Sequence, residues 1–370
     1  ILLKGGTLHT VSGDVLEGYD LLFAKGIIVT IDQQIQASPE TDVYDIYGKH
    51  VVPGYIAGFT RIGLTEISAV KQTNDHSEIG EINPNVRANV SYNPDSDLIP
   101  VTRSNGILLV NSAPASGRIS GQSSVMMLDG WTWEDATMKH PAALNLNWPS
   151  MHFNFRKDAK KKEKDQRDNY NKAIREIDIL VRDVEAYHQR RTVKERKADQ
   201  KQQSDLRLES MIPFVIHHEP IHIRANDIRQ IEAAVKWANK HNFNIVIVGG
   251  QDAWRIPELL VKYNIPVILM SIQTTPTRRF EPIHTPYKIP AMLHEAGVKF
   301  CISTDPGYPF DGHVRTLPNE AMRAAAWGLP KSEALRSITL SAAEILGVDE
   351  RVGSLEPGKD ATFFISDTHP

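Results

Sequence analysis

Short apolar runs, separated by polar and turn-forming residues, recur along the middle of the chain. Several of these runs precede segments whose apolar residues recur with the period of a helix, as in residues 227–240 and 253–263. Strands and helices that alternate in this way are typical of parallel βαβ units. The pattern predicts strands at residues 51–57, 107–111, 124–128, 142–146, 221–225, 245–248, 266–269 and 299–303.

The beginning of the chain has a different pattern. Apolar stretches at residues 1–3, 21–24 and 27–31 are short, and Gly-Gly or Lys-Gly pairs lie between them. Such spacing favours strands joined by tight turns over a helix. It predicts a small antiparallel sheet that precedes the alternating region.

Residues 155–212 are crowded with charged and amide side chains, which separates them from their surroundings. Apolar residues within this segment lie on one face of a helix, so we expect a helical insertion, either one helix or a pair, on the barrel rim. The basic run 160–164 could bind an anion. A solvated helix face is the better interpretation, because acids and amides are interspersed with the basic residues.

Composition narrows the range of functions. The chain has 370 residues, of which 41% are hydrophobic and 24% charged, as in globular proteins with a sizeable core. The net charge of -3 gives no reason to expect nucleic acid or an anionic membrane as a partner. The single cysteine, Cys301, excludes an internal disulfide and a cysteine-based zinc cluster. No apolar run approaches the roughly 20 residues of a membrane span.

Residues 50–64, HVVPGYIAGFTRIGL, resemble the first barrel strand of the amidohydrolase superfamily, with its pattern V-x-P-G-x-I-D-x-H-x-H-x-G. Residues 353–365, GSLEPGKDATFFI, are similar to the segment with which that family completes its N-terminal sheet. Further motifs are similar to the imidazolonepropionase-like branch. They lie at residues 83–88, 92–97, 103–107, 119–121, 314–318 and 325–329.

The resemblance implies an α/β fold, a (β/α)8 TIM barrel with its site at the C-terminal ends of the strands. It also guides the count of eight strands, because the second and third connections are irregular. Residues 51–349 would form the barrel, including the charged insertion. Residues 1–50 and 350–370 would form a small, discontinuous β-sandwich domain from both chain ends.

In this superfamily, six side chains at the strand ends hold metal ions that hydrolyse C–N bonds other than peptide bonds. The resemblance places only one retained ligand in this chain, the aspartate after the eighth strand. A phenyl ring has no lone pair to donate, and a guanidinium would repel zinc. We therefore expect no metal cofactor, with zinc as the alternative. The corresponding residues are Phe59, Arg61, Asn147, Arg224, Gly249 and Asp305.

Other polar residues are candidates for binding a ligand. If Arg61 and Arg224 point inward, they could pair with Asp305 in place of a metal. Asn147, His284 and His313 would lie on the same side of the barrel, the two histidines in loops after the seventh and eighth strands. Residues 249–253 follow a strand and open a helix, so they could offer backbone N–H groups to an anion. A tight turn with Asp252 as the N-cap is the simpler interpretation.

Three functions follow as hypotheses. The favoured one is a non-catalytic or strongly impaired superfamily member that binds a small molecule, another copy of itself or a catalytic relative. An active metal-dependent C–N hydrolase with an atypical site around Asp305 is the alternative. A metal-free enzyme that uses Asp305 with the arginines is the third. Exported relatives in this branch favour the periplasm over the cytoplasm.

Overall fold

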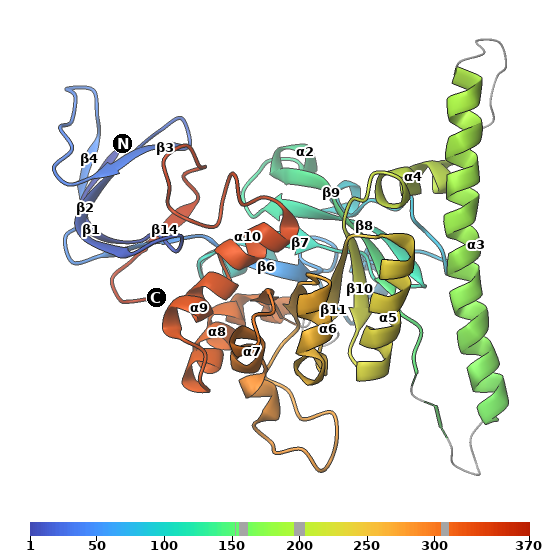
Figure 1. The fold of residues 1–370 in the computed structure, drawn as a ribbon. Coiled ribbons are helices and arrows are strands. Elements are labelled where there is room, and N and C mark those ends of the chain that lie inside the picture. Colours follow the sequence, from blue (N-terminus) through green and yellow to red (C-terminus); the bar gives the residue numbers. More distant parts are fainter. Residues whose placement is uncertain (152, 155–161, 196–203, 305–310) are drawn as a thin grey trace.

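The computed structural model describes residues 1–151, 153–154, 162–195, 204–304 and 311–370. A small sheet containing both chain ends lies on one side of a larger sheet, and a long helix stands on the other (Figure 1). None of the helices in the described part of the chain combines the length and apolar character needed to cross a bilayer. The Asp305 position falls outside the described residues.

The larger sheet has eight strands in the order β13-β12-β11-β10-β9-β8-β7-β6. It is nearly closed, because the Ser303 hydroxyl accepts a hydrogen bond from the N–H of Phe59 and donates one to its carbonyl, both at 3.0 Å. All eight predicted positions contain strand residues of this sheet, which confirms the barrel-like α/β architecture. The strands are β6 (Tyr55–Thr60), β7 (Ile107–Ser112), β8 (Ile119–Met127), β9 (Thr137–Asn147), β10 (Ile221–Ala225), β11 (Ile245–Gly249), β12 (Val267–Leu269) and β13 (Phe300–Ile302).

The prediction of a regular parallel (β/α)8 barrel is wrong at one strand, β8. β8 runs antiparallel to both β7 and β9, whereas the other neighbouring pairs are parallel. The connections 113–118 and 128–136 are too short for the crossover of a dozen or more residues that a parallel pair needs, so the chain turns back as hairpins. The second connection holds only the short helix α2 (Trp133–Ala136).

Helices cover the outer face of the barrel sheet (Figure 1). On β10, Ile221, Ile223 and Ala225 pack into the outer apolar layer, while His222 and Arg224 face the barrel interior. The helix predicted at residues 227–240 is observed at nearly the expected bounds, whereas the one predicted at residues 253–263 divides into a 3₁₀ turn and a short helix. The helices and turns that follow the strands are α1 (Leu98–Arg103), α5 (Ile228–His241), η3 (Ala253–Arg255), α6 (Pro257–Lys262), α7 (Thr285–Glu295), η4 (Asp311–Thr316), α8 (Leu317–Ala326), α9 (Lys331–Ser337) and α10 (Leu340–Leu346).

The predicted strand 51–57 divides between two sheets. Its first half is β5, which belongs to the small sheet, and its second half is β6 of the barrel. Gly54 lies at the break, where its N–H donates to the carbonyl of Thr362 at 2.9 Å. The small sheet has the order β14-β5-β1-β2-β3, and β4 pairs with β1. Its strands are β1 (Leu2–His9), β2 (Val15–Ala24), β3 (Ile27–Asp32), β4 (Val43–Asp45), β5 (His50–Pro53) and β14 (Phe363–Ser366).

Both chain ends contribute to this small sheet, since β14 pairs antiparallel with β5. The expected sandwich of two sheets is not confirmed. β4 and β5 pair with successive halves of β1, so within the described residues they extend one sheet and do not stack a second upon it. The domain boundaries at residues 50 and 350 stay predictions.

The charged insertion contains two helices, α3 (Glu163–Glu195) and α4 (Leu206–Val215), between β9 and β10. Ile177, Val181 and Val184 are buried on the inner face of α3, as the spacing predicted. Asp178 of α3 accepts hydrogen bonds from Trp237 at 2.8 Å and His241 at 3.2 Å. The insertion therefore packs on the flank of the barrel against α5, and an ion pair between Arg118 and Glu176 connects it to the loop before β8.

Candidate functional site at the barrel mouth

The C-terminal ends of the parallel strands surround a small cavity of about 10 Å³. β6, β9, β10 and β11 all contribute side chains to it, together with two residues of the loop after β7. Three of the residues predicted for the site, Phe59, Asn147 and Arg224, meet here. The full lining is Phe59, Pro114, Ala115, Asn145, Leu146, Asn147, His222, Arg224 and Val248.

Asn147 and Arg224 form the outer polar layer of this mouth cavity. They are register partners on the neighbouring parallel strands β9 and β10. The Asn147 amide nitrogen donates to the carbonyl of Gly117 at 2.8 Å and to the Ser120 hydroxyl at 2.9 Å, which fixes the amide. Arg224 is half-buried, and the described part of the chain supplies its guanidinium with no carboxylate or other hydrogen-bond acceptor.

Asn145 and His222 form a deeper polar layer, and sequence reasoning assigned neither to the site. They too are register partners, two residues before Asn147 and Arg224. His222 is 1% exposed, and among the described residues neither ring nitrogen has a hydrogen-bond partner; the same holds for Oδ1 of Asn145. Burial, with a smaller contribution from Lys139, lowers the pKa of His222 to about 3. The signal in the sequence was the two-residue spacing between His222 and Arg224, which puts both on one strand face.

Gly249 ends β11 in a conformation that excludes a side chain. Its φ is +101°, and a Cβ atom there would lie 2.2 Å from Oδ1 of Asn226. A histidine, the residue expected at this position in a metal-binding relative, does not fit this backbone. The predicted tight turn is present, because Gly250 also has a positive φ of +62°. The predicted N-cap is wrong, since the Asp252 side chain caps no helix of its own and bonds to Arg278.

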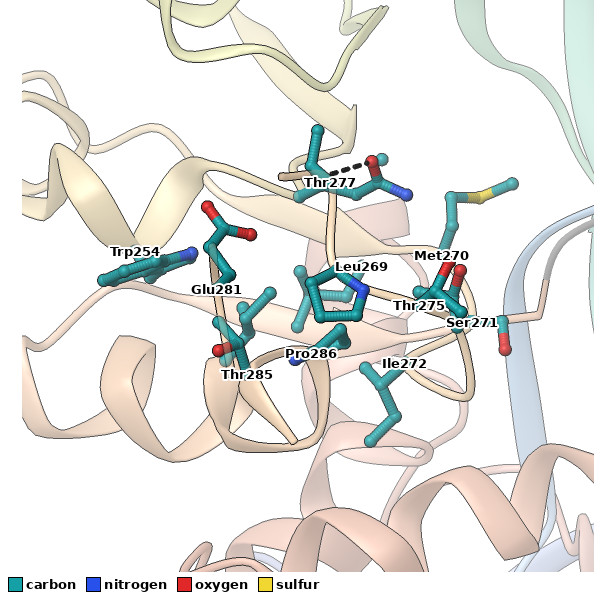
Figure 2. A pocket seen from close by; sticks show the side chains of 15 residues that line it. Trp254, Leu269, Met270, Ser271, Ile272, Thr275, Thr277, Glu281, Thr285 and Pro286 are labelled. Carbon is teal, nitrogen blue, oxygen red and sulfur yellow. Dashed lines mark hydrogen bonds between the residues drawn. The ribbon is translucent and has the colours of Figure 1, made fainter. Parts of the chain in front are cut away.

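Beside the mouth, Gly249 also lines a second small pocket, of about 20 Å³, between the loops after β11 and β12. Trp254 and Glu281 lie on one side of it and Met270 and Ser271 on the other (Figure 2). Glu320, which is 3% exposed, accepts hydrogen bonds from the Ser271 hydroxyl at 2.6 Å and the Ile272 N–H at 3.0 Å. Burial raises the pKa of Glu320.

An ion pair fixes the loop 270–284 that covers this second pocket. Arg278 donates to both carboxylate oxygens of Asp252, at 2.7 and 2.6 Å, and to Glu281 at 3.0 Å. The bond to Asp252 is the main cause of the raised pKa of Arg278. The side chain of Asp252 is only 2% exposed, and Arg255 lies 3.4 Å from it, so loss of Arg278 leaves this buried carboxylate with a longer ion pair.

We predict that Arg278→Met lowers the free energy of unfolding by about 2–3 kcal/mol, less than for a fully buried pair because Arg278 is partly exposed. Urea denaturation measures the change. Arg279→Met is the matched control, since Arg279 is exposed in the same loop, and it should change stability by no more than about 0.5 kcal/mol. Equal effects of the two substitutions would contradict the structural role of the ion pair.

The remaining predicted residues do not line the mouth cavity. Arg61 is half-buried directly after β6. His284 precedes α7 and stacks on Trp327, with ring centroids 5.1 Å apart. His313 is exposed in η4. The proposed pairing of the arginines with Asp305 concerns a residue outside the described ranges, and it stays a prediction.

The side chains at the mouth do not fit a catalytic zinc ion. Zinc sites of this kind need three or more imidazole, thiolate or carboxylate ligands around one point. The described positions offer a phenyl ring at Phe59, a guanidinium at Arg224 and no side chain at Gly249. Nowhere among the described residues do three His, Cys, Asp or Glu side chains gather closely enough to share a metal ion.

Comparison with known proteins agrees with the fold. The model of the Amidohydrolase family matches residues 284–370. The amidohydrolase tasK of Hapsidospora irregularis is 23% identical over 382 residues, which cover 95% of this chain. The chain spans 38% of the length of that relative.

Two solved structures illustrate the likeness. The crystal structure of an amidohydrolase from Thermotoga maritima superposes with a TM-score of 0.86 at 23% identity, covering 100% of this chain and 94% of the other. A Xaa-Pro dipeptidase with bound methionine in the active site superposes with a TM-score of 0.55 at 14% identity, again covering 100% and 94% of the two chains. Together with the eight-stranded, nearly closed sheet, these matches show an amidohydrolase-like fold, and they support a relationship to the amidohydrolase superfamily.

Proposed function

We propose that this chain is a superfamily member without metal-dependent hydrolysis, which binds a small molecule at its barrel mouth. The observation that carries the proposal is the backbone of Gly249, where a Cβ atom would lie 2.2 Å from the Asn226 side chain. The positive φ of +101° also disfavours any residue with a Cβ atom, so a ligand at this position would require the backbone and Asn226 to adjust. Phe59 and Arg224 add two positions that donate no electron pair to a metal.

The motifs at residues 83–88 and 325–329 support a place in the imidazolonepropionase-like branch, which we include in the proposal. Association with a second copy or with a catalytic relative stays a prediction, as does location in the periplasm. Asp305 stays the proposed catalytic candidate of the alternative, an active hydrolase.

Zinc content tests the proposal directly. We expect protein purified with added zinc, and then passed through a desalting column, to contain only background metal by mass spectrometry. Near-stoichiometric zinc would refute the proposal and favour the hydrolase. Asp305→Asn sharpens the comparison, because in a hydrolase it lowers both zinc content and activity. In a protein without a metal site, it changes stability alone.

A further inference from the structure

We infer that the mouth cavity binds the carboxylate end of a small ligand that carries a hydroxyl or N–H group on the next atom. Arg224 would bind the carboxylate, and His222 with Asn145 would recognise the neighbouring polar group. This inference rests on the proposed function, because it requires a mouth without a metal ion.

The first step is the unpaired charge of Arg224. The guanidinium is half-buried beside Phe59 and Val248, and the described residues offer it no acid. A cation in such surroundings loses much of its hydration, so an anion that replaces water there is bound strongly. The planar fork of five N–H donors suits a carboxylate, which can accept two parallel hydrogen bonds.

The second step is the unsatisfied layer beneath Arg224. Both ring nitrogens of His222 and Oδ1 of Asn145 are buried without a partner among the described residues. Buried polar groups in folded proteins are almost always hydrogen-bonded, so these atoms are expected to bind a water molecule or the polar group of a ligand. The imidazole is neutral, since burial holds its pKa at about 3, and it therefore donates one hydrogen bond and accepts another.

These atoms together define the chemistry of the ligand. The layer has two acceptors, Oδ1 of Asn145 and the unprotonated nitrogen of His222, so the ligand must bring a donor. Arg224 requires negative charge at the same place. A carboxylate with an adjacent O–H or N–H supplies both, whereas a simple carboxylate lacks the donor and an amide lacks the charge.

Size restricts which part of a ligand enters. A volume of about 10 Å³ is the space that one water molecule needs. Only the hydroxyl or N–H group of a ligand therefore reaches His222. Its carboxylate would lie outside that group at Arg224, and the remainder over Pro114 and Ala115, the loop residues in the lining. The smallest compound with the required groups is glycolate, which makes it the appropriate probe.

Isothermal titration calorimetry with glycolate, acetate and glycolamide tests the inference. The neutral chelator 1,10-phenanthroline is included so that stray metal contributes nothing. We expect glycolate to bind more tightly than acetate, and glycolamide not to bind. Arg224→Met should lower the association constant for glycolate by about tenfold or more, the value of a charged hydrogen bond.

Two further variants separate recognition from a general change in the protein. Arg182→Met is the matched control, because Arg182 is exposed on α3 and bonds only to the carbonyl of Asp178 in its own helix. It should leave glycolate binding unchanged. His222→Phe should weaken glycolate binding while thermal stability at neutral pH stays equal or rises, because the substitution removes two unpaired buried nitrogens. If His222 only filled space, His222→Phe would leave glycolate binding unchanged.

The inference is overturned if glycolate fails to bind the wild-type protein, or if it binds Arg224→Met as well as wild type. Zinc content of the same sample distinguishes this failure from failure of the proposed function. Background zinc with no glycolate binding rejects only the carboxylate site. Stoichiometric zinc, with glycolate binding that phenanthroline abolishes, rejects both.

Discussion

Acidification from neutral pH to about pH 4 is expected to lower the free energy of unfolding by several kcal/mol, the largest effect predicted here. Three histidines cause it: His9 and His222 are buried, and His140 is partly buried. The pKa of His9 and of His140 is lowered to about 4, and that of His222 to about 3, from an ordinary value of 6.5. Burial is the main cause at each position. The second contribution comes from His369 for His9, from Arg87 for His140 and from Lys139 for His222.

The direction follows from which state binds protons first. In the unfolded chain each histidine is protonated as the pH falls through its ordinary pKa. In the folded chain the same histidine is protonated only at a lower pH. The stabilisation is therefore complete above the unfolded pKa and is lost as the pH falls towards the folded pKa. Each unit by which the folded and unfolded pKa values differ corresponds to about 1.4 kcal/mol of stability. At His140 the geometry gives the same direction, because Arg87 donates to its Nε2 at 3.0 Å and protonation there breaks that bond.

Urea denaturation at neutral pH and near pH 4 measures the loss. His222→Phe should reduce the difference between the two conditions by the share of His222, on the order of 3 kcal/mol. His217→Phe is the matched control, since His217 is exposed just before β10. An unfolding free energy that stays constant over this pH range, or equal shifts in the two variants, would contradict the prediction.

Gly249→His is expected to destabilise the protein by about 3 kcal/mol and to restore no zinc binding. The positive φ of +101° disfavours any residue with a Cβ atom, and the overlap at 2.2 Å with Asn226 forces the backbone or the asparagine to move. Combining Gly249→His with Phe59→His and Arg61→His should also leave the zinc content at background. The reason is that the end of β11 still presents no metal ligand in the required position.

Gly297→His provides the control for this experiment. Gly297 also has a positive φ, +74°, but nothing lies within 4 Å of its Cβ position. Gly297→His should therefore lower the free energy of unfolding only by the cost of the positive φ, about 1–2 kcal/mol. If the two variants lose equal stability by denaturant unfolding, contact with Asn226 is not what excludes a side chain at position 249. The proposed loss of the metal site would then depend on Phe59 and Arg224 alone.

The candidate site was predictable only in part. The family motif located Phe59, Asn147 and Arg224, and the structure brings these three to one cavity. His284 and His313 lay in the expected loops but not at the cavity, because a loop position does not fix where its side chain points. Neither His222 nor Asn145 was assigned to the site. From sequence, a histidine within an apolar strand is expected to be part of the core. Only the structure shows that both nitrogens of His222 lack hydrogen-bond partners among the described residues.

Sequence patterns alone located most of the strands and helices, because apolar runs and helical periods are local properties that neighbouring residues encode. The sequence also determined that zinc donors are missing at Phe59 and Arg224, since side-chain chemistry is read directly. The folded chain was needed to show that β8 runs antiparallel, that residues 51–57 divide between two sheets, and that Gly249 disfavours a side chain. These outcomes depend on contacts between residues distant in sequence and on backbone angles that many sequences allow, so no local pattern specifies them.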